Sequence, residues 1–384
     1  MYKMYKWILV TGLLAQLLLF SKAASANSSE DGPAAGRDYR LVSKQLLKAA
    51  GLKLDWQTNL ALVKKGEYLD KLMLVDGRIY ALSSKNYLVS LDAEKGNVVF
   101  SRDFAAENIP VIGIKKYNSP STNTNGGKDL LYSVIGNELT EINTNLGTEI
   151  KAVPLSWEVV CPPERNKQFY YISGVDKRLH ALQADNKVRM FDVAADNDSR
   201  IVSVIADDEF VVFGTELGNI ISIEPDNPTK LWQFDMYGPL AGNIVRRGNA
   251  LFMASADTNI YKIDITTKQL IWRYQSRALL KDGPQVTGST VYQHVPNKGM
   301  VAIDIDSGSS KWRLENGLDL LAESQNKAYI YAPPGKLVVM DNEKGKQLYS
   351  MNFAGVTKYV CNQDNRRIYI ADDSGRVACI EPAE

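Results

Sequence analysis

Histidine, the side chain that most often does acid-base chemistry near neutral pH, is scarce in this sequence. Only two histidines are present, His180 and His294. His180 alternates with apolar residues, which is typical of a strand with one buried face. His294 lies near a predicted strand-to-turn junction and is the more accessible of the two. A general base must reach its substrate at hydrogen-bonding distance, and neither context favours that, so we expect both histidines to be structural.

The acidic residues also lack the spacing of a catalytic or metal site. Two adjacent acid pairs flank predicted strands at turns, where solvated acids are common: Asp207-Asp208 and Asp372-Asp373. Residues 192–198 are acidic but do not have the spacing of a calcium-binding loop. No nucleophile elbow of the G-x-S-x-G type and no glycine-rich phosphate loop occurs. The sequence therefore predicts no catalytic, cofactor-binding or metal-binding residue.

The cysteines give no site either. Cys161, Cys361 and Cys379 are an odd number, so at most one disulfide can form. No pair of them has the spacing of metal ligands, and no C-x-x-C or H-E-x-x-H motif is present. We expect buried free thiols.

The elements that carry these residues repeat about every forty positions. Each unit places an acid or amide at the end of an apolar strand, and we call this the anchor position. The anchors are Asp92, Asn143, Gln183, Glu224, Asp264, Asp304, Asp341 and Glu381, separated by 51, 40, 41, 40, 40, 37 and 40 residues. An aromatic residue follows eight positions after six of them: Phe100, Phe191, Trp232, Trp272, Trp312 and Tyr349. Lys151 occupies this position, which we call the docking position, in the second unit.

Each unit is predicted to be four short β-strands. Runs such as residues 210–213 and 367–370 are rich in β-branched and aromatic residues. Turn pairs such as Leu217-Gly218 and Ser307-Gly308 separate the strands, and no unit holds a long stretch of helical period. Four antiparallel strands per forty residues are typical of a β-propeller blade. In such a blade the docking aromatic fills the gap between blades, contributing about 2–3 kcal/mol, and the anchor accepts hydrogen bonds from turn N–H groups.

The two ends of the repeat region complement each other. The last unit stops before its fourth strand, whereas an unmatched Leu-Asp-Trp-Gln segment, residues 54–57, precedes the first unit. We predict that this segment supplies the missing strand, closes the ring and removes two free sheet edges. The prediction is an all-β, eight-bladed propeller of four-stranded antiparallel blades over residues 53–384, closed by an N-terminal strand. The 51-residue spacing marks an insertion at residues 119–127.

The N-terminus predicts export. Lys3 and Lys6 precede a 14-residue apolar run, and Ala24-Ser25-Ala26 follows it. This pattern is typical of a signal peptide of residues 1–26, because the run is shorter than the roughly 18–20 residues that cross a bilayer. No cysteine follows that could be acylated. We expect cleavage near Ala26, a periplasmic or secreted product and no transmembrane segment after cleavage.

Residues 27–52 are predicted to be a polar leader followed by a short helix. Val42, Leu46 and Ala50 would lie on one face of that helix, and Gly51 would cap it. The chain has a formal charge of +1, which falls to −2 without the three lysines of the signal peptide. Such a charge gives no sign of a strongly basic chain, so a nucleic-acid partner is not expected. We expect a monomer.

One repeat resembles a known motif. The pattern Ala-x-Asp304-x-x-Ser-Gly308-x-x-x-Trp312 resembles the tryptophan-docking motif of pyrroloquinoline-quinone-type propeller repeats. The units that end in Trp272, Trp232 and Phe100 are weaker copies, and the resemblance covers residues 53–384. That family includes quinone-dependent alcohol and sugar dehydrogenases. It also includes cofactor-free members such as the propeller lipoprotein of the outer-membrane barrel-assembly machinery, which this chain matches in size but not in its acylated cysteine.

The resemblance leaves three functions open. The dehydrogenases that it implies carry a vicinal disulfide near the quinone, but this chain has no Cys-Cys pair and little loop material for a pocket. We therefore predict a non-catalytic exported scaffold, without cofactor, whose partner is another envelope or secreted protein. Its candidate binding loops are residues 119–127, 161–164 and 237–239, and its outer strand edges could also pair with a partner strand. The alternatives are a quinone- and calcium-dependent dehydrogenase and a carbohydrate or small-ligand receptor.

Overall fold

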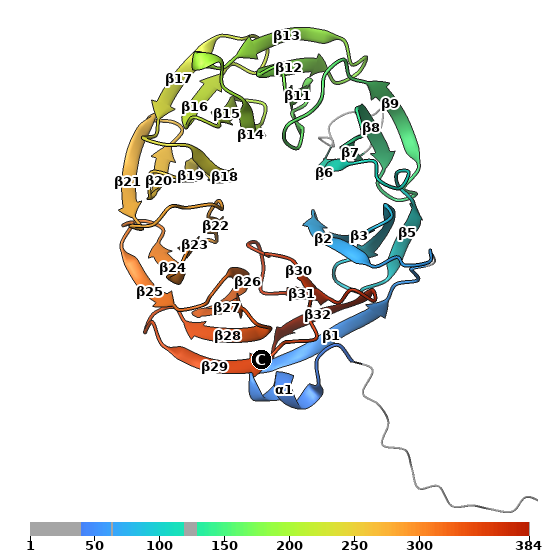
Figure 1. The fold of residues 1–384 in the computed structure, drawn as a ribbon, viewed down its shortest axis with the longest axis vertical. Helices are drawn as coiled ribbons and strands as arrows, with labels where there is room; N and C mark the ends of the chain where they lie inside the picture. Colours follow the sequence, from blue (N-terminus) through green and yellow to red (C-terminus); the bar gives the residue numbers. More distant parts are fainter. Residues whose placement is uncertain (1–39, 63, 119–128, 384) are drawn as a thin grey trace, which may run out of the picture. The chain divides into compact units, whose positions relative to one another are not determined.

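The computed structural model describes residues 40–62, 64–118 and 129–383. The predicted signal peptide of residues 1–26 and the predicted insertion of residues 119–127 lie outside them. The described strands form eight antiparallel sheets of four, which follow one another around a ring (Figure 1). The predicted all-β, eight-bladed propeller is confirmed.

The first four blades run in chain order from β2. They consist of β2 (Leu69–Val75), β3 (Arg78–Ser83), β4 (Tyr87–Asp92) and β5 (Val98–Asp103); β6 (Val111–Tyr117), β7 (Leu130–Ile135), β8 (Glu138–Asn143) and β9 (Glu149–Pro154); β10 (Glu164–Arg165), β11 (Phe169–Ser173), β12 (Arg178–Gln183) and β13 (Arg189–Ala194); and β14 (Ile201–Ala206), β15 (Val211–Thr215), β16 (Asn219–Ile223) and β17 (Lys230–Asp235). A 3-10 turn, η1 (Asp196–Asp198), precedes the fourth blade.

The other four blades complete the ring. They consist of β18 (Leu240–Arg247), β19 (Ala250–Ser255), β20 (Asn259–Asp264) and β21 (Gln269–Gln275); β22 (Gln285–Val286), β23 (Thr290–Val295), β24 (Gly299–Asp304) and β25 (Ser310–Leu314); β26 (Asp319–Ser324), β27 (Lys327–Ala332), β28 (Lys336–Asp341) and β29 (Gln347–Asn352); and β30 (Lys358–Tyr359), β31 (Ile368–Ala371), β32 (Arg376–Pro382) and β1 (Leu52–Asn59). In each blade the first strand lies nearest the ring centre and the fourth lies at the rim (Figure 1).

Anchor residues fix the turn between the third and fourth strands. Asp304 ends β24, and its Oδ1 accepts hydrogen bonds from the backbone N–H of Ser307 at 2.9 Å and of Asp306 at 3.2 Å. These donors lower the pKa of Asp304 because they stabilise the carboxylate. Asn143 and Asp341 accept equivalent turn hydrogen bonds, so the predicted role of the anchor is confirmed at these positions.

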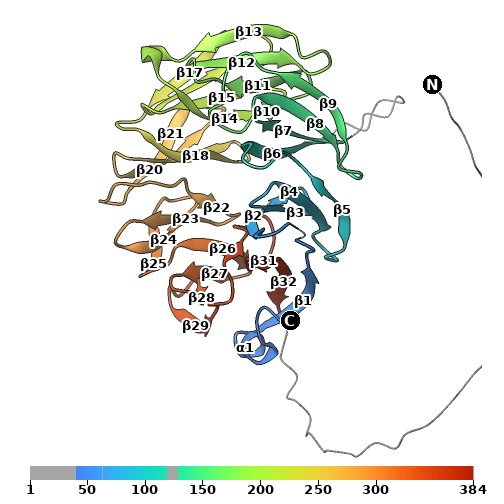
Figure 2. The same ribbon diagram turned by 45° about the vertical axis from the view of Figure 1, so that its right-hand side comes forward.

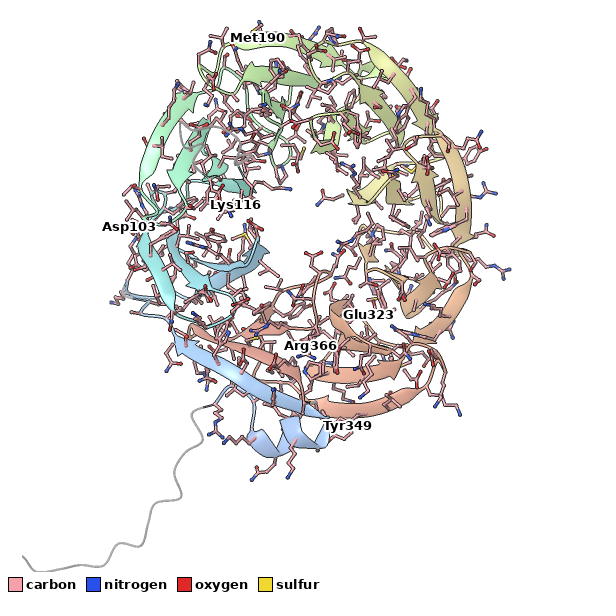
Figure 3. The ribbon with its side chains drawn as sticks, turned by 180° about the vertical axis from the view of Figure 1, so that it is seen from behind. Asp103, Lys116, Met190, Glu323, Tyr349 and Arg366 are labelled. Carbon is pink, nitrogen blue, oxygen red and sulfur yellow. The ribbon has the colours of Figure 1, made fainter. Side chains whose placement is uncertain are left out.

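A β-bulge precedes every docking position. Ala302 pairs with Trp312 and Ile303 with Ser310, so Lys311 is an extra residue in β25. The same shift occurs in the fourth strand of all eight blades. A bulge bends its strand and re-aims the next side chain, and here it turns the docking residue toward the following blade. Met190 and Tyr349, which lie on fourth strands, mark the rim of the ring in Figure 3.

The docking side chain packs on the anchor turn of the next blade. The indole N–H of Trp272 donates to the carbonyl of Ile305 at 2.9 Å, and its ring lies over Gly308. A Cβ at Gly308 would lie 2.7 Å from that ring, and its φ is +70°, so only glycine fits there without strain. The core clusters accordingly join neighbouring blades, whose sheets face each other around the ring (Figure 2).

The predicted closure by an N-terminal strand is confirmed. β1 pairs with β32 along its length, with Lys53 opposite Glu381 and Asn59 opposite Arg376. Trp56 then docks on the first blade, where its indole N–H donates to the carbonyl of Ala93 at 3.1 Å. The first and last segments of the propeller therefore share one sheet, as the incomplete last unit predicts.

A short helix, α1 (Lys44–Ala49), packs outside this closing blade (Figure 1). Leu47 is its buried residue, whereas the sequence assigned its apolar face to Val42, Leu46 and Ala50. The predicted face is wrong in part because the helix begins after Ser43, its N-cap, and Val42 precedes it. Val42 is nevertheless buried in the same cluster as Leu47.

Candidate functional site

Because neighbouring strands are antiparallel, successive connections along the chain lie alternately at the two ends of the ring. The first-to-second and third-to-fourth strand connections share one end with the anchor turns, and we call this end the anchor face. The second-to-third turns and the crossovers from one blade to the next lie at the other end, the crossover face. Among the described residues, eight connection residues are exposed large apolar side chains. Six lie on the crossover face, namely Tyr68, Ile109, Val175, Leu217, Tyr237 and Leu279, and two on the anchor face, Leu146 and Val188.

Tyr237 is the most exposed of these apolar residues, at 81%. It lies in the crossover from β17 to β18, where the sequence predicted a binding loop at residues 237–239. The backbone of this loop is held in place: the N–H of Tyr237 donates to Asp257 Oδ2 at 3.1 Å, and the N–H of Met236 donates to the carbonyl of Gly218 at 3.0 Å. An aromatic ring on a fixed backbone loses little entropy when a partner covers it, which is typical of a binding anchor.

The predicted loop at residues 161–164 is not an open surface loop. Cys161 is buried, with its Sγ 3.1 Å from Ser173 Oγ, and Pro162 packs against Gly113. Glu164 Oε1 lies 2.7 Å from Lys115 Nζ, and burial raises the pKa of Glu164. This segment borders a cavity of about 230 Å³ between inner strands. Its side chains therefore form the wall of the ring rather than a projecting contact.

His180 is buried on a strand, as its alternation with apolar residues predicts, but its partner was not foreseen. It is 1% exposed on β12, and its Nε2 lies 3.0 Å from Asp176 Oδ2. The ring of Trp157 stacks on it with 3.8 Å between ring centroids. Burial lowers the pKa of His180, so the neutral ring clamps the crossover from blade 2 to blade 3. Trp157 stands outside the repeat, and the only signal for it was an isolated Trp in a connection between blades.

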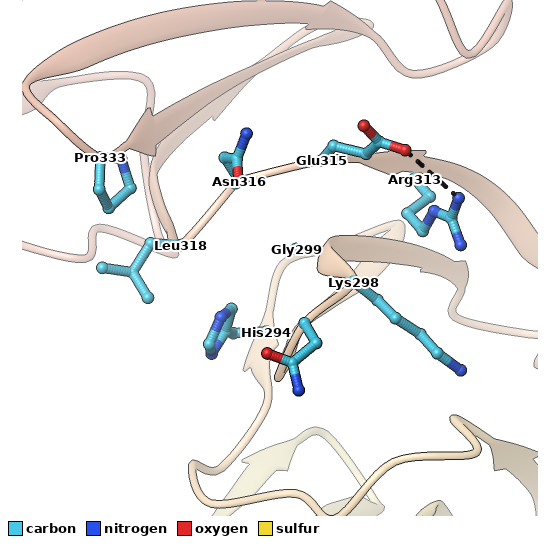
Figure 4. Close-up of a pocket in the computed structure, with 10 residues that line it drawn as sticks. His294, Lys298, Gly299, Arg313, Glu315, Asn316, Leu318 and Pro333 are labelled. Atoms are coloured by element: carbon cyan, nitrogen blue, oxygen red, sulfur yellow. Dashed lines mark ion pairs between the residues drawn. The ribbon is translucent and has the colours of Figure 1, made fainter.

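His294 borders a cavity of about 530 Å³ on the crossover face between blades 6 and 7 (Figure 4). Its Nδ1 is buried and lies 3.8 Å from Asp282 Oδ2, too far for a hydrogen bond. Leu318 and Pro333 form the apolar side of the cavity. The remaining lining is polar: Asn297, Lys298, Gly299, Arg313, Glu315, Asn316 and Gly317. Such a cavity has the size of a small-ligand site but not the mainly apolar lining that most such sites have.

A segment of blade 8 reaches across to other blades near the ring centre. Asp364 accepts a hydrogen bond from Arg247 of blade 5, with Oδ1 2.7 Å from Nη1. Gln363 Oε1 accepts from the N–H of Val286 in blade 6 at 2.8 Å, and the N–H of Asn362 donates to Leu321 of blade 7 at 3.1 Å. Residues 362–364 therefore occupy space on the anchor-face side that would otherwise be open to a ligand.

The acid pairs lie at turns, as expected, but Asp372 is buried rather than solvated. Asp207 accepts hydrogen bonds from the N–H groups of Glu209 and Phe210 and forms an ion pair with Arg246. Asp208 accepts from the N–H of Lys167. Asp372 binds the turn at residues 374–376, and Asp373 binds Thr357 and Lys358. In residues 192–198 the acids pair with separate cations rather than with one another.

The three cysteines are free thiols in the structure. Cys161 and Cys379 are buried and Cys361 is half-buried. Burial raises the pKa to about 11 for Cys161 and to about 12 for Cys361 and Cys379. A thiol with a raised pKa is a poor nucleophile at neutral pH.

The chain offers poor support for a quinone with its cation. Within residues 40–62, 64–118 and 129–383, no three His, Cys, Asp or Glu side chains gather closely enough to hold a metal ion. Residues 362–364 also narrow the space near the ring centre.

Comparisons with known proteins agree with the fold. A family model described as "Outer membrane protein assembly factor BamB" matches residues 216–384, from the turn after β15 of blade 4 through blade 8. The repeats within residues 216–384 are therefore similar to those of the pyrroloquinoline-quinone-like type. No curated protein sequence matches the chain.

Two solved structures share its architecture. BamB from Moraxella catarrhalis superposes with a TM-score of 0.63 at 14% identity, covering 86% of this chain and 97% of that one. The computationally designed protein Ika8 superposes with a TM-score of 0.61 at 15% identity, covering 85% and 100%. At such identities the likeness concerns the fold alone.

Proposed function

We propose that this β-propeller of pyrroloquinoline-quinone-like repeats is a non-catalytic exported scaffold that holds another envelope or secreted protein. The observation that carries the proposal is the set of six exposed large apolar residues in the connections of the crossover face, of which Tyr237 is the most exposed. The name of the matching family model, an outer membrane protein assembly factor, supports a role in envelope assembly. Interface cores are enriched in aromatic residues, and a rigid ring presents them without reorganisation.

The crossover face can be tested with a photo-crosslinking residue placed at Tyr237 or Leu217 in cells that make the full chain. Leu146, on the anchor face, is the matched control because it is also an exposed large apolar residue in a connection. We expect one defined protein adduct from the crossover-face positions, identified by mass spectrometry, and none from Leu146. Equal labelling from both faces, or no adduct from Tyr237 and Leu217, would contradict the proposal.

Export supports an envelope role and has its own test. No helix in the described parts of the chain is long and apolar enough to cross a membrane. We propose that residues 1–26 are removed as a signal peptide, which leaves Asn27 as the new N-terminus. N-terminal sequencing of the protein from the envelope fraction should begin at Asn27. An intact N-terminus in the cytoplasmic fraction would refute export.

A small polar ligand remains a second candidate, because His294 and two asparagines border the 530 Å³ cavity. A ligand at 100 times its dissociation constant stabilises the native state by about 2.7 kcal/mol. Thermal shift with a sugar panel, and with quinone plus calcium, therefore separates the three functions. A shift that His294→Ala abolishes would support the receptor, whereas a quinone shift with dye reduction would support the dehydrogenase.

A further inference from the structure

The rim of blade 5 carries an unusual run of unpaired positive charge. Lys268, Arg273, Arg277 and Lys281 are all exposed along residues 266–281, which contain no acidic residue. None of the four side chains makes an ion pair or a hydrogen bond within the described residues. The run follows the chain from the anchor turn, along β21, to the crossover toward blade 6.

The other fourth strands balance their charges. Six of them contain an acidic residue or a cation within ion-pairing distance of one, such as Asp192 with Arg178 in blade 3 and Lys311 with Asp304 in blade 6. β9 contains Glu149, and β29 contains no charged residue. Of the eight fourth strands, β21 alone contains a cation but neither an acidic residue nor an ion pair.

β21 also has a free edge and exposed apolar side chains. It is the terminal strand of the sheet β18-β19-β20-β21, so the backbone N–H and C=O groups on its outer side have no strand partner. Leu270 and Ile271 are 43% and 47% exposed, and Leu279 is 63% exposed beyond the end of the strand. With seven residues, β21 is longer than the fourth strands of blades 1 to 4, 6 and 7, and it lies at the rim in Figure 1.

We propose that the edge of β21 accepts an extended, acidic and partly apolar segment of a partner protein as a fifth strand of blade 5. Strand addition satisfies the unpaired backbone groups and takes specificity from side chains. The cations at positions 268, 273, 277 and 281 are complementary to glutamate or aspartate side chains, and Leu270 and Ile271 favour apolar residues between them. An anionic lipid surface would meet the charges but would leave the strand edge unpaired. The inference rests on the proposed scaffold role for the existence of a protein partner.

Binding to a defined peptide tests the proposal directly. The probe is a fluorescent eight-residue peptide that alternates valine and glutamate, measured by anisotropy against the purified chain. We expect binding tighter than about 1 mM, the weak end of specific recognition. The double variant Lys268→Glu with Arg273→Glu should weaken binding about tenfold or more, because like charges then face each other.

Three controls make the outcome decisive. Lys230→Glu changes a cation on the fourth strand of blade 4, where Lys230 already pairs with Asp196 at 3.3 Å, and should leave affinity unchanged. A peptide that is N-methylated at alternate residues keeps its charge but loses backbone donors, and should not bind. An equally affine N-methylated peptide, no effect of the double variant, or binding only to phosphatidylglycerol vesicles would overturn strand addition. Because Tyr237 is not altered, its crosslinking result stands independently of these outcomes.

Discussion

Two junctions between blades join equivalent strands in different ways. At the junction of blades 5 and 6, Trp272 occupies the docking position and covers Gly308 of the next anchor turn. At the junction of blades 2 and 3, the docking residue is Lys151, and Lys187 stands where the glycine would be. Lys151 donates to the carbonyl of Asp185 at 3.2 Å, so it still reaches the turn of the next blade.

A buried ionic network replaces the indole at the second of these junctions. Glu141 is 6% exposed, and its Oε1 lies 2.7 Å from Lys187 Nζ and 2.6 Å from the hydroxyl of Tyr170. Arg165 donates to that hydroxyl at 2.8 Å and lies over the ring of Tyr117. The comparison teaches that the repeat requires a link between each fourth strand and the next anchor turn, and that either a ring or a charge network can supply it.

The largest difference between the junctions should appear on removing Glu141. Glu141→Ala removes the buried carboxylate that forms ion pairs with Lys187 at 2.7 Å and Arg165 at 3.8 Å, and breaking a buried pair in this way costs about 3–5 kcal/mol. We expect a loss of that size in the free energy of unfolding, measured by urea denaturation. Glu149→Ala, an exposed acid on the adjacent strand β9, should change the stability by less than about 0.5 kcal/mol. Equal small effects would show that the network does not hold the junction.

The junction of blades 5 and 6 should lose less stability when Trp272 is replaced by a smaller aromatic residue. Trp272→Phe keeps an aromatic ring over Gly308 but removes the N–H that donates to Ile305, so we expect a loss of about 1–2 kcal/mol. The same denaturation experiment measures it. Phe100 already occupies the docking position of blade 1 and covers Gly147, which is why the smaller ring should be tolerated. A loss as large as that of Glu141→Ala would show that the hydrogen bond matters more than the ring.

The two junctions also mark how far the sequence could be interpreted. The indole type was predictable because Asp, Gly and Trp recur at fixed spacing, and their roles depend only on local turn geometry and a ring's size. The charge network was not, because Glu141, Arg165 and Lys187 hold ordinary positions in their strands and turns. Their pairing becomes visible only once two blades face each other.

The same limit applies to the candidate site. The loop at residues 237–239 could be singled out because Gly-Pro after an aromatic signals an exposed turn, and Tyr237 is indeed exposed. The loop at residues 161–164 carries similar turn residues, yet the ring buries it against Gly113 and Ser173. Composition identifies a turn but does not tell whether the folded ring exposes the turn or packs it against other strands.

Low pH should destabilise the junction of blades 2 and 3 in particular, because His180 lies there. Burial lowers its pKa, so the unfolded chain takes up this proton before the folded chain does. The contribution of neutral His180 to the stability of the folded chain is fully present above the unfolded pKa of about 6.5. It is lost as pH falls below that value. We expect the melting temperature to fall less between pH 7 and pH 5 in His180→Gln than in the parent. An unchanged profile in His180→Gln would mean that the clamp under Trp157 does not sense pH.

The smallest effect should come from Lys151 itself. Its side chain is half-exposed and makes a hydrogen bond to one carbonyl, so Lys151→Met keeps the aliphatic stem and removes a single partly solvated contact. We expect a loss of less than about 1 kcal/mol, well below that of Glu141→Ala in the same junction. Because the two residues lie on neighbouring strands and Glu141 pairs directly opposite Lys151, the double variant should show whether they act together. If the losses in free energy of unfolding of the two single variants add up in the double variant, the buried network holds the junction without Lys151. If the losses are strongly coupled, Lys151 is part of the network and is the counterpart of Trp272.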